Sequence, residues 1–244
     1  MKIRILPLFL LAFIALSFFS CKKIKTPEAE IEREKWYSTF NDSIEYYQQQ
    51  ISEVNLRLDN LNADIGRMLS NFELISNPRE VSGYYLLKGW SKKIPFTSTA
   101  IYARINENEK LEIIATLAGH TFNRIEVGNC FSEVVPHDQA FNFRHERYNT
   151  VYFSGGKADT IAEYISGHKS EKINLEFIEG ARKNSFLIPS DEKDMISQTW
   201  ELYHTKRETA ELQKMLWYYS RKIDTFRRMQ DRNEQSAKNK EENA

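Results

Sequence analysis

The chain has 244 residues, with 34 Lys and Arg against 34 Asp and Glu, and 41% of its residues are hydrophobic. This balance argues against a nucleic-acid-binding protein, which normally carries a basic excess on one face or tail. The chain has only two cysteines, Cys21 and Cys130, which excludes a disulfide-stapled scaffold and a cysteine-rich zinc module.

The first 20 residues have the layout of an export signal. Lys2 and Arg4 form a positive start, residues 5–19 are almost entirely apolar, and Ser20 and Cys21 follow. A helix over this apolar run would span about 22 Å, short of the roughly 30 Å of a hydrocarbon core. A removable secretory signal is therefore favoured over a membrane-spanning helix.

The motif Phe18-Phe19-Ser20-Cys21 stands where a lipobox would lie, and the segment resembles a bacterial lipoprotein signal of the Bacteroidetes type. The family prefers Leu at −3 and a small residue at −2, so both phenylalanines depart from its pattern. The resemblance implies that residues 1–20 are removed and that Cys21 carries diacylglycerol, with an acyl chain such as palmitate on its amine.

The implied location is the cell envelope, with the protein anchored in the outer membrane and facing the periplasm. Lys22, Lys23 and Lys25 follow Cys21, where surface-exported lipoproteins of that group often carry acidic residues. Two or three acyl chains hold a protein on a bilayer almost permanently. An uncleaved anchor or a free secreted protein would be the alternatives.

A long helix is predicted over 28–76, after a linker at 21–27. Thr26-Pro27 supplies its start and Asn77-Pro78 its stop, because the residue before a proline is pushed out of the helical region. Apolar residues recur at alternating spacings of three and four, which is typical of a coiled coil. This first seam comprises Tyr37, Phe40, Ile44, Tyr47, Ile51, Val54, Leu58, Leu61, Ile65, Met68, Phe72 and Ile75.

A second long helix is predicted over 190–233, with 234–244 as a disordered tail. Ser190 can be its N-cap, although Lys193 stands where a capping box has Glu. The second seam is weaker because four of its positions are Gln or Thr. It comprises Met195, Gln198, Leu202, Thr205, Thr209, Leu212, Leu216, Tyr219, Ile223, Phe226 and Gln230.

The two seams can be laid against each other in an antiparallel pair. The predicted layers are Ile75 with Met195, Met68 with Leu202, Leu58 with Leu212, Ile51 with Tyr219 and Ile44 with Phe226. The predicted fold class is therefore α+β, with two long terminal helices forming an antiparallel coiled-coil stalk around a small β-rich head. Such a stalk would lift the head up to roughly 70 Å from the bilayer.

The alternative is that the helices pack on the head or on other subunits. Six aromatic residues outside the seams would suit a trimer interface or a partner, so a homo-oligomer is left open. They are Trp36, Tyr46, Trp200, Tyr203, Trp217 and Tyr218.

The middle segment, 79–189, is predicted to be the β-rich head. Its clearest hairpin turns at 106–109, a short helix is expected at 158–166, and Glu179-Gly180 is predicted to be a turn. Strands are expected at 81–90, 98–105, 111–118, 123–127, 140–143, 149–153, 172–178 and 185–188.

The sequence predicts no catalytic residue, metal site or cofactor. The spacing of the histidines, His120, His137, His145, His168 and His204, matches no familiar ligand pattern. Cys130 between strands is typical of a small buried hydrophobe. Residues 153–157 lack the first Gly and the final Ser or Thr of a phosphate-binding loop, so we interpret them as a strand-to-helix turn.

The remaining functional hint in the head is aromatic. Neighbouring strand residues point to opposite faces of a sheet, so one member of Tyr84-Tyr85 and one of Tyr152-Phe153 is expected to be exposed. Tyr84, Tyr85 and Tyr152 are therefore the candidate binding surface.

The function predicted from these features is that of a lipid-anchored, non-enzymatic scaffold or binding module of the cell envelope. Its expected partners are the membrane, through Cys21, and an envelope protein, with no nucleic acid. The order helix, β segment, helix is similar to that of prefoldin subunits, which makes a holdase-like periplasmic chaperone the alternative. An enzyme with an unrecognised site in the head is the other alternative.

Overall fold

The computed structural model describes residues 27–76, 83–94, 98–135 and 148–242. Cys21, His137, His145 and the strand expected at 140–143 lie outside these residues. The chain divides into two compact units, Met1–Ile51 with Tyr218–Ala244 (unit 1) and Ser52–Trp217 (unit 2). The described part is α+β, with three helices and two antiparallel sheets.

Two of the helices are long, as the seams predict. Helix α2 runs from Pro27 to Leu69 and α4 from Ser190 to Glu242, while the short α3 spans Gly156–Gly167. The predicted starts at residues 28 and 190 are correct to within one residue. Both predicted ends are wrong, in opposite directions.

The helix predicted to reach residue 76 stops at Leu69, and Phe72–Ile75 is strand β1. Phe72 and Ile75 continue the spacing of three and four, so the pattern does not reveal the change. Pairing with β2 (Tyr84–Leu87) decides it, because Phe72 lies opposite Leu87 and Ile75 opposite Tyr84. Along β1, Phe72 is buried and Leu74 is exposed.

The predicted disordered tail is also corrected, since α4 continues through residues 234–242. This stretch is polar, which favoured disorder, but it contains neither Gly nor Pro and is rich in good helix formers. The helix therefore continues although few apolar residues are available to pack.

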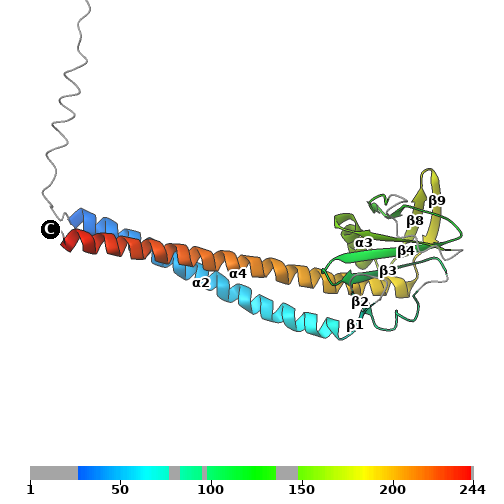
Figure 1. The fold of residues 1–244 in the computed structure, drawn as a ribbon, viewed down its shortest axis with the longest axis horizontal. Coiled ribbons are helices and arrows are strands. Elements are labelled where there is room, and N and C mark those ends of the chain that lie inside the picture. The colour runs from blue at the N-terminus through cyan, green and yellow to red at the C-terminus, as the bar shows by residue number, and fades with distance from the viewer. Residues whose placement is uncertain (1–26, 77–82, 95–97, 136–147, 243–244) are drawn as a thin grey trace, which may run out of the picture. The chain divides into compact units, whose positions relative to one another are not determined.

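In unit 1, α2 and α4 run in opposite directions and contact each other through aromatic rings (Figure 1). The centroid of the Tyr47 ring lies 5.6 Å from that of Tyr219 and 6.0 Å from that of Phe226. Tyr47 is therefore level with Ile223, which is buried. The predicted layer of Ile75 with Met195 is not a helix pair, because Ile75 lies in β1 and Met195 contacts Ala103 of β3.

In unit 2, the other halves of the same helices also run in opposite directions. Arg57 forms an ion pair with Glu208. Val54 and Leu58 of the first seam are buried, as is Leu212 of the second.

The larger sheet has the strand order β1-β2-β3-β4-β7. Its central hairpin is the predicted one, with Arg104 opposite Glu112 and Ile105 opposite Leu111. Both faces of this hairpin are buried along most of its length. The strands not yet bounded are β3 (Ala100–Asn106), β4 (Leu111–Ala118) and β7 (Tyr148–Ser154).

The smaller sheet has the order β6-β5-β8-β9, with β5 at Arg124–Val127, β6 at Cys130–Phe131, β8 at Asn174–Glu179 and β9 at Arg182–Leu187. The predicted turn at Glu179-Gly180 joins β8 to β9, with Gly180 at φ 57°. Strand β6 escaped prediction because it has only two residues.

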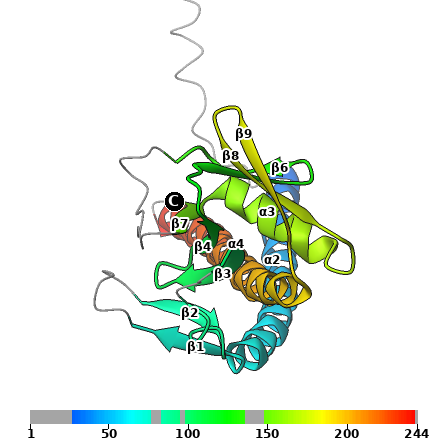
Figure 2. The same cartoon turned by 90° about the vertical axis from the view of Figure 1, so that its right-hand side faces the viewer.

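Helix α3 contacts strands of both sheets, among them β4 and β6 (Figure 2). Its buried side chains, Ala158, Ile161, Ala162 and Ile165, belong to one hydrophobic core with Ile113, Phe122, Phe153, Leu175 and Phe177. A Cβ atom at Gly128, where φ is 56°, would lie 2.4 Å from the Tyr164 ring, so both the backbone conformation and the approach of the β5–β6 turn to α3 favour glycine.

Candidate functional site

The candidate aromatic surface is divided between the two faces of the larger sheet. Tyr84 and Tyr152 flank the Arg104 guanidinium, whose carbon lies 4.1 Å from one ring centroid and 5.0 Å from the other. Tyr85, paired with Ile105, belongs to the opposite face. The structure therefore brings together Tyr84 and Tyr152 but not Tyr85.

Arg104 is a buried charge surrounded by partners. Its Nε donates to Glu112 Oε2 at 2.6 Å, and Asn106 Nδ2 donates to the other oxygen of the same carboxylate at 2.9 Å. Buried ions are tolerated when they are paired and hydrogen-bonded in this way. Tyr84 is itself buried, and it packs against the cation across the sheet. This geometry explains how the strands are held in register.

Tyr85 instead lies beside α4, in the same unit. The Lys206 ammonium is 5.5 Å from the centroid of the Tyr85 ring and 2.7 Å from a carboxylate oxygen of Glu109. Glu109 sits at φ 58° in the turn between β3 and β4. Lys206 therefore joins the helix to the tip of this hairpin.

A second buried charged group caps an edge of β3. Strand β2 pairs with β3 only at Tyr84–Asn106 and Tyr85–Ile105. Beyond that point, the Ile101 N–H donates to Glu192 Oε2 at 3.0 Å and the Ala103 N–H to Met195 Sδ at 3.3 Å. The first turns of α4 thus take the place of a strand.

Glu192 differs from Arg104 in its surroundings. Burial is the main cause that raises the pKa of its carboxyl to about 7, and the hydrogen bond from Ile101 opposes the shift. The charged groups near it are Asp191 and Lys93, which pair with each other at 2.7 Å. Their hydrogen bond lowers the pKa of Asp191.

Helix α4 is also held to the first turn of α3. The Tyr203 hydroxyl donates to Asp159 Oδ2 at 3.0 Å, and an Arg207 nitrogen lies 3.3 Å from the same oxygen. Burial raises the pKa of Asp159, although the Tyr203 hydrogen bond opposes this. Burial likewise raises the pKa of Tyr203. These contacts position α4 on the head.

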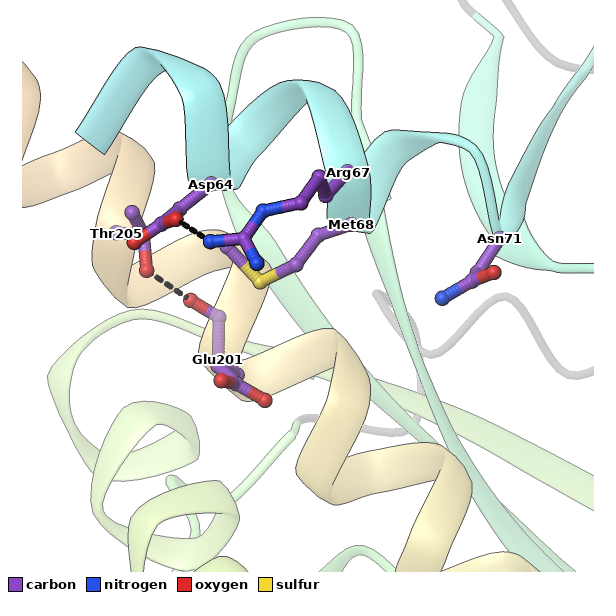
Figure 3. A pocket seen from close by; sticks show the side chains of 6 residues that line it. All are labelled: Asp64, Arg67, Met68, Asn71, Glu201 and Thr205. Carbon is purple, nitrogen blue, oxygen red and sulfur yellow. Dashed lines mark hydrogen bonds and ion pairs between the residues drawn. The ribbon is translucent and has the colours of Figure 1, made fainter. Parts of the chain in front are cut away.

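Two hollows flank one turn of α4, and they are the candidate binding site of unit 2. The first, of about 280 Å³, lies between α2 and α4 and is shown in Figure 3. Arg67 turns back to pair with Asp64 of its own helix, while Thr205 donates to the Glu201 backbone carbonyl at 2.8 Å. Met68 and Asn71 complete the lining.

The second hollow, of about 240 Å³, lies on the other side of the same turn and shares Glu201 and Thr205. It adds the Trp200 and His204 rings, whose centroids are 5.6 Å apart, and Lys169. Sequence reasoning missed both hollows, because residues 64–71, 166–169 and 197–205 meet only through the fold.

The structure also places His168, Cys130 and the turn at 153–157, which the sequence had singled out. The His168 ring stacks on Tyr164, with centroids 4.2 Å apart, and its Nδ1 lies 2.8 Å from the Tyr164 carbonyl oxygen. Cys130 is partly buried at the core and has a free thiol. The predicted strand-to-helix turn at 153–157 is confirmed, since β7 ends at Ser154 and α3 begins at Gly156.

Across the described ranges, no group of three or more His, Cys, Asp or Glu residues is placed to hold a metal ion. In the same part of the chain, none of the helices combines the length and the apolar character needed to cross a membrane. Comparison with known proteins finds no matching family model, no matching curated protein and no matching solved structure.

Proposed function

We propose that the chain is a lipid-anchored, non-enzymatic scaffold or binding module of the cell envelope. In this proposal α2 and α4 form an antiparallel coiled-coil stalk, the acylated Cys21 is the anchor, and the β-rich head meets an envelope partner. The observation that supports the proposal is the set of ring contacts between α2 and α4 in unit 1, Phe40 with Phe226 and Tyr47 with Tyr219.

Burial along α2 supports the coiled coil. Every seam position from Tyr37 to Met68 is buried or half-buried, whereas the residues between them are mostly exposed. A hydrophobic stripe with the period of 3.5 residues is what a coiled coil requires. The ring contacts of Tyr47 in unit 1 and the burial of Leu58 and Leu212 in unit 2 fit one register.

The anchor is supported by sequence. Cys21 follows an apolar segment that ends in a lipobox-like motif, and α2 begins six residues later, at Pro27. A thiol acylated at this position would tie the start of α2 to a bilayer, with Lys22, Lys23 and Lys25 beside the headgroups.

A pair of cysteines tests the stalk in the full chain. In a Cys130→Ser background, Leu58→Cys with Leu212→Cys is expected to cross-link within one chain under mild oxidation. Leu56→Cys with Leu212→Cys is the matched control, because Leu56 lies outside the seam and is 66% exposed. Failure of the first pair, or equal cross-linking of both pairs, would contradict the coiled coil.

Cys21→Ser tests the anchor. We expect this variant to lose the incorporation of labelled palmitate and to leave the membrane fraction, while Cys130→Ser keeps both properties. Retention of Cys21→Ser in the membrane would contradict lipidation. Cross-linking in intact cells followed by purification should then recover one or a few defined envelope proteins; general suppression of the aggregation of unfolded proteins would instead support a chaperone.

A further inference from the structure

In unit 1, each helix carries a line of residues directly beside its seam, which we call a stripe. On α2 the stripe is Trp36, Thr39, Ser43, Tyr46 and Gln50, and on α4 it is Tyr218, Lys222, Thr225 and Met229. We call these nine residues the flank. Each of them precedes a seam residue by one position, so in an antiparallel pair both stripes fall on the same side.

The flank exposes large apolar side chains. Trp36 is 46% exposed, Tyr46 57%, Tyr218 48% and Met229 42%. A two-stranded coil buries only its seam, whereas helices of a bundle bury a third position of each heptad as well. With the seam at positions a and d, the flank comprises one such third position, g (Trp36, Ser43, Gln50, Lys222 and Met229), and the position c beside it (Thr39, Tyr46, Tyr218 and Thr225).

The flank is continuous with the contact between the two helices. The Trp36 ring lies 4.1 Å from Phe40, Tyr46 lies 5.3 Å from Tyr47, and Tyr218 lies 5.8 Å from Tyr219, between ring centroids. Each pair joins a flank residue to a seam residue. The aromatic packing of the seam therefore extends onto the surface of unit 1.

The α2 stripe carries no charge from Trp36 to Gln50, and two of its polar groups are satisfied within the helix. Thr39 donates to the Lys35 carbonyl at 2.9 Å, and Ser43 to the Thr39 carbonyl at 2.7 Å. Covering these hydroxyls would leave no donor unpaired, so the stripe can be buried at little cost.

We propose that the flank is the surface through which two copies of this chain pair into a four-helix bundle. A two-fold axis parallel to the helices would set α2 of one copy against α4 of the other. It would also keep both N-termini at the same end, which suits two chains on one membrane. The pairing extends the proposed function to a dimeric scaffold and does not require the acyl anchor.

Charge favours a second copy over a lipid surface. Residues 27–51 contain six acidic and two basic residues, whereas 218–242 contain seven basic and five acidic residues. The two-fold arrangement sets the acidic half against the basic half of the partner. An anionic bilayer would repel the acidic α2 half, and the flank offers it only Lys222.

Thiol cross-linking in membranes tests the proposal with the full chain. In a Cys130→Ser background, Ser43→Cys lies in the middle of the flank and should give a dimer with a flexible bis-maleimide. Leu56→Cys, exposed on another side of α2, is the matched control and should give far less dimer. Equal yields, or a Ser43→Cys adduct with a different protein, would overturn the proposal.

Sedimentation of the full chain in mild detergent gives the stoichiometry. We expect two copies for the unmodified chain and a dimer dissociation constant raised by about 100-fold or more for Tyr46→Glu, because a carboxylate would be buried without a partner. Met229→Glu should act in the same direction, and Leu56→Glu should leave the dimer unchanged.

Circular dichroism should show the same helicity for these variants as for the unmodified chain. The two substitutions lie on different helices, so local unfolding of one helix would not explain the loss of the dimer in both. A single copy at every concentration tested would overturn the proposal. So would a monomer that binds anionic vesicles and loses this binding on Tyr46→Glu, since that outcome assigns the flank to lipid.

Discussion

Unit 2 and unit 1 differ in how completely they bury their apolar side chains. In unit 2, strands and helices enclose side chains such as Phe177 and Ile113 that have no solvent exposure. In unit 1, the described residues belong to two helices, and Ile223 is buried while Tyr47 and Phe226 are half-buried. Unit 2 thus has a core shielded from solvent, whereas the stability of unit 1 depends on the line of contact between its two helices.

The largest effect that separates the units should come from Phe177→Ala. The Phe177 ring contacts Phe122 at 4.8 Å and Phe186 at 6.5 Å between centroids. Its loss should lower the unfolding free energy of unit 2 by about 3–5 kcal/mol through the cavity that it leaves. Urea unfolding measures the change, and Phe131→Ala, at an exposed position of the same sheet, is the control.

Hydrogen exchange then shows whether the units are independent. Peptides from 100–118 should lose protection in Phe177→Ala while those from 35–51 keep it. Equal losses in both would mean that the two units unfold as one.

Glu192→Gln should give the next largest effect, and it depends on pH. Burial raises the carboxyl pKa from 4.5 to about 7, so the folded chain binds the proton more tightly than the unfolded chain. Wild-type stability therefore falls as the pH rises from about 4.5 through 7, by about 3 kcal/mol in all.

The glutamine variant should lose this slope and be the more stable form at pH 8. Glu201→Gln, at an exposed position of the same helix, should keep the wild-type profile. Parallel profiles for wild type and Glu192→Gln would show that Glu192 does not titrate in this range.

Ile223→Ala should do the opposite of Phe177→Ala, because it should destabilise unit 1 and leave unit 2 unchanged. Removing this buried seam residue should destabilise the helix pair of unit 1 by about 2 kcal/mol, near the lower end for buried Ile because its neighbours are half-exposed. Amide exchange should accelerate at 35–51 and 218–239 and stay unchanged in β3 and β4. Arg228→Ala, at an exposed position of α4, serves as the control.

Arg57→Ala should have the smallest effect. Arg57 pairs with Glu208, but 63% of its side chain is exposed, and such pairs contribute about 0.2–1 kcal/mol. A double-mutant cycle with Glu208→Ala measures the coupling, which should weaken further in high salt. A coupling above this range would show that the pair is shielded in solution.

The sequence predicts that the periodic elements of this fold exist better than it predicts where they end. Both seams and the hairpin at 102–116 follow from spacing and turn residues, and the structure confirms the two long helices and the hairpin. The end of α2 is missed because Phe72 and Ile75 fit a helix and a strand equally well, and only pairing with β2 decides between them.

The buried charges were harder to predict. Arg104 and Glu112 lie opposite each other in the observed hairpin, and the predicted turn at 106–109 did not specify that pairing. Glu192 had no signal in the sequence, because its surroundings depend on where β2 leaves β3. The hollows beside α4 likewise combine segments that are remote in sequence.

The cap on β3 bears on how this strand could associate with other molecules. A strand with free N–H groups can recruit a strand from another molecule and begin aggregation. Here a carboxylate and a thioether occupy the two amides of Ile101 and Ala103, and a helix blocks the approach. The first turns of α4 thus cover this part of the edge of β3, and these two amides are not available to a strand of another molecule.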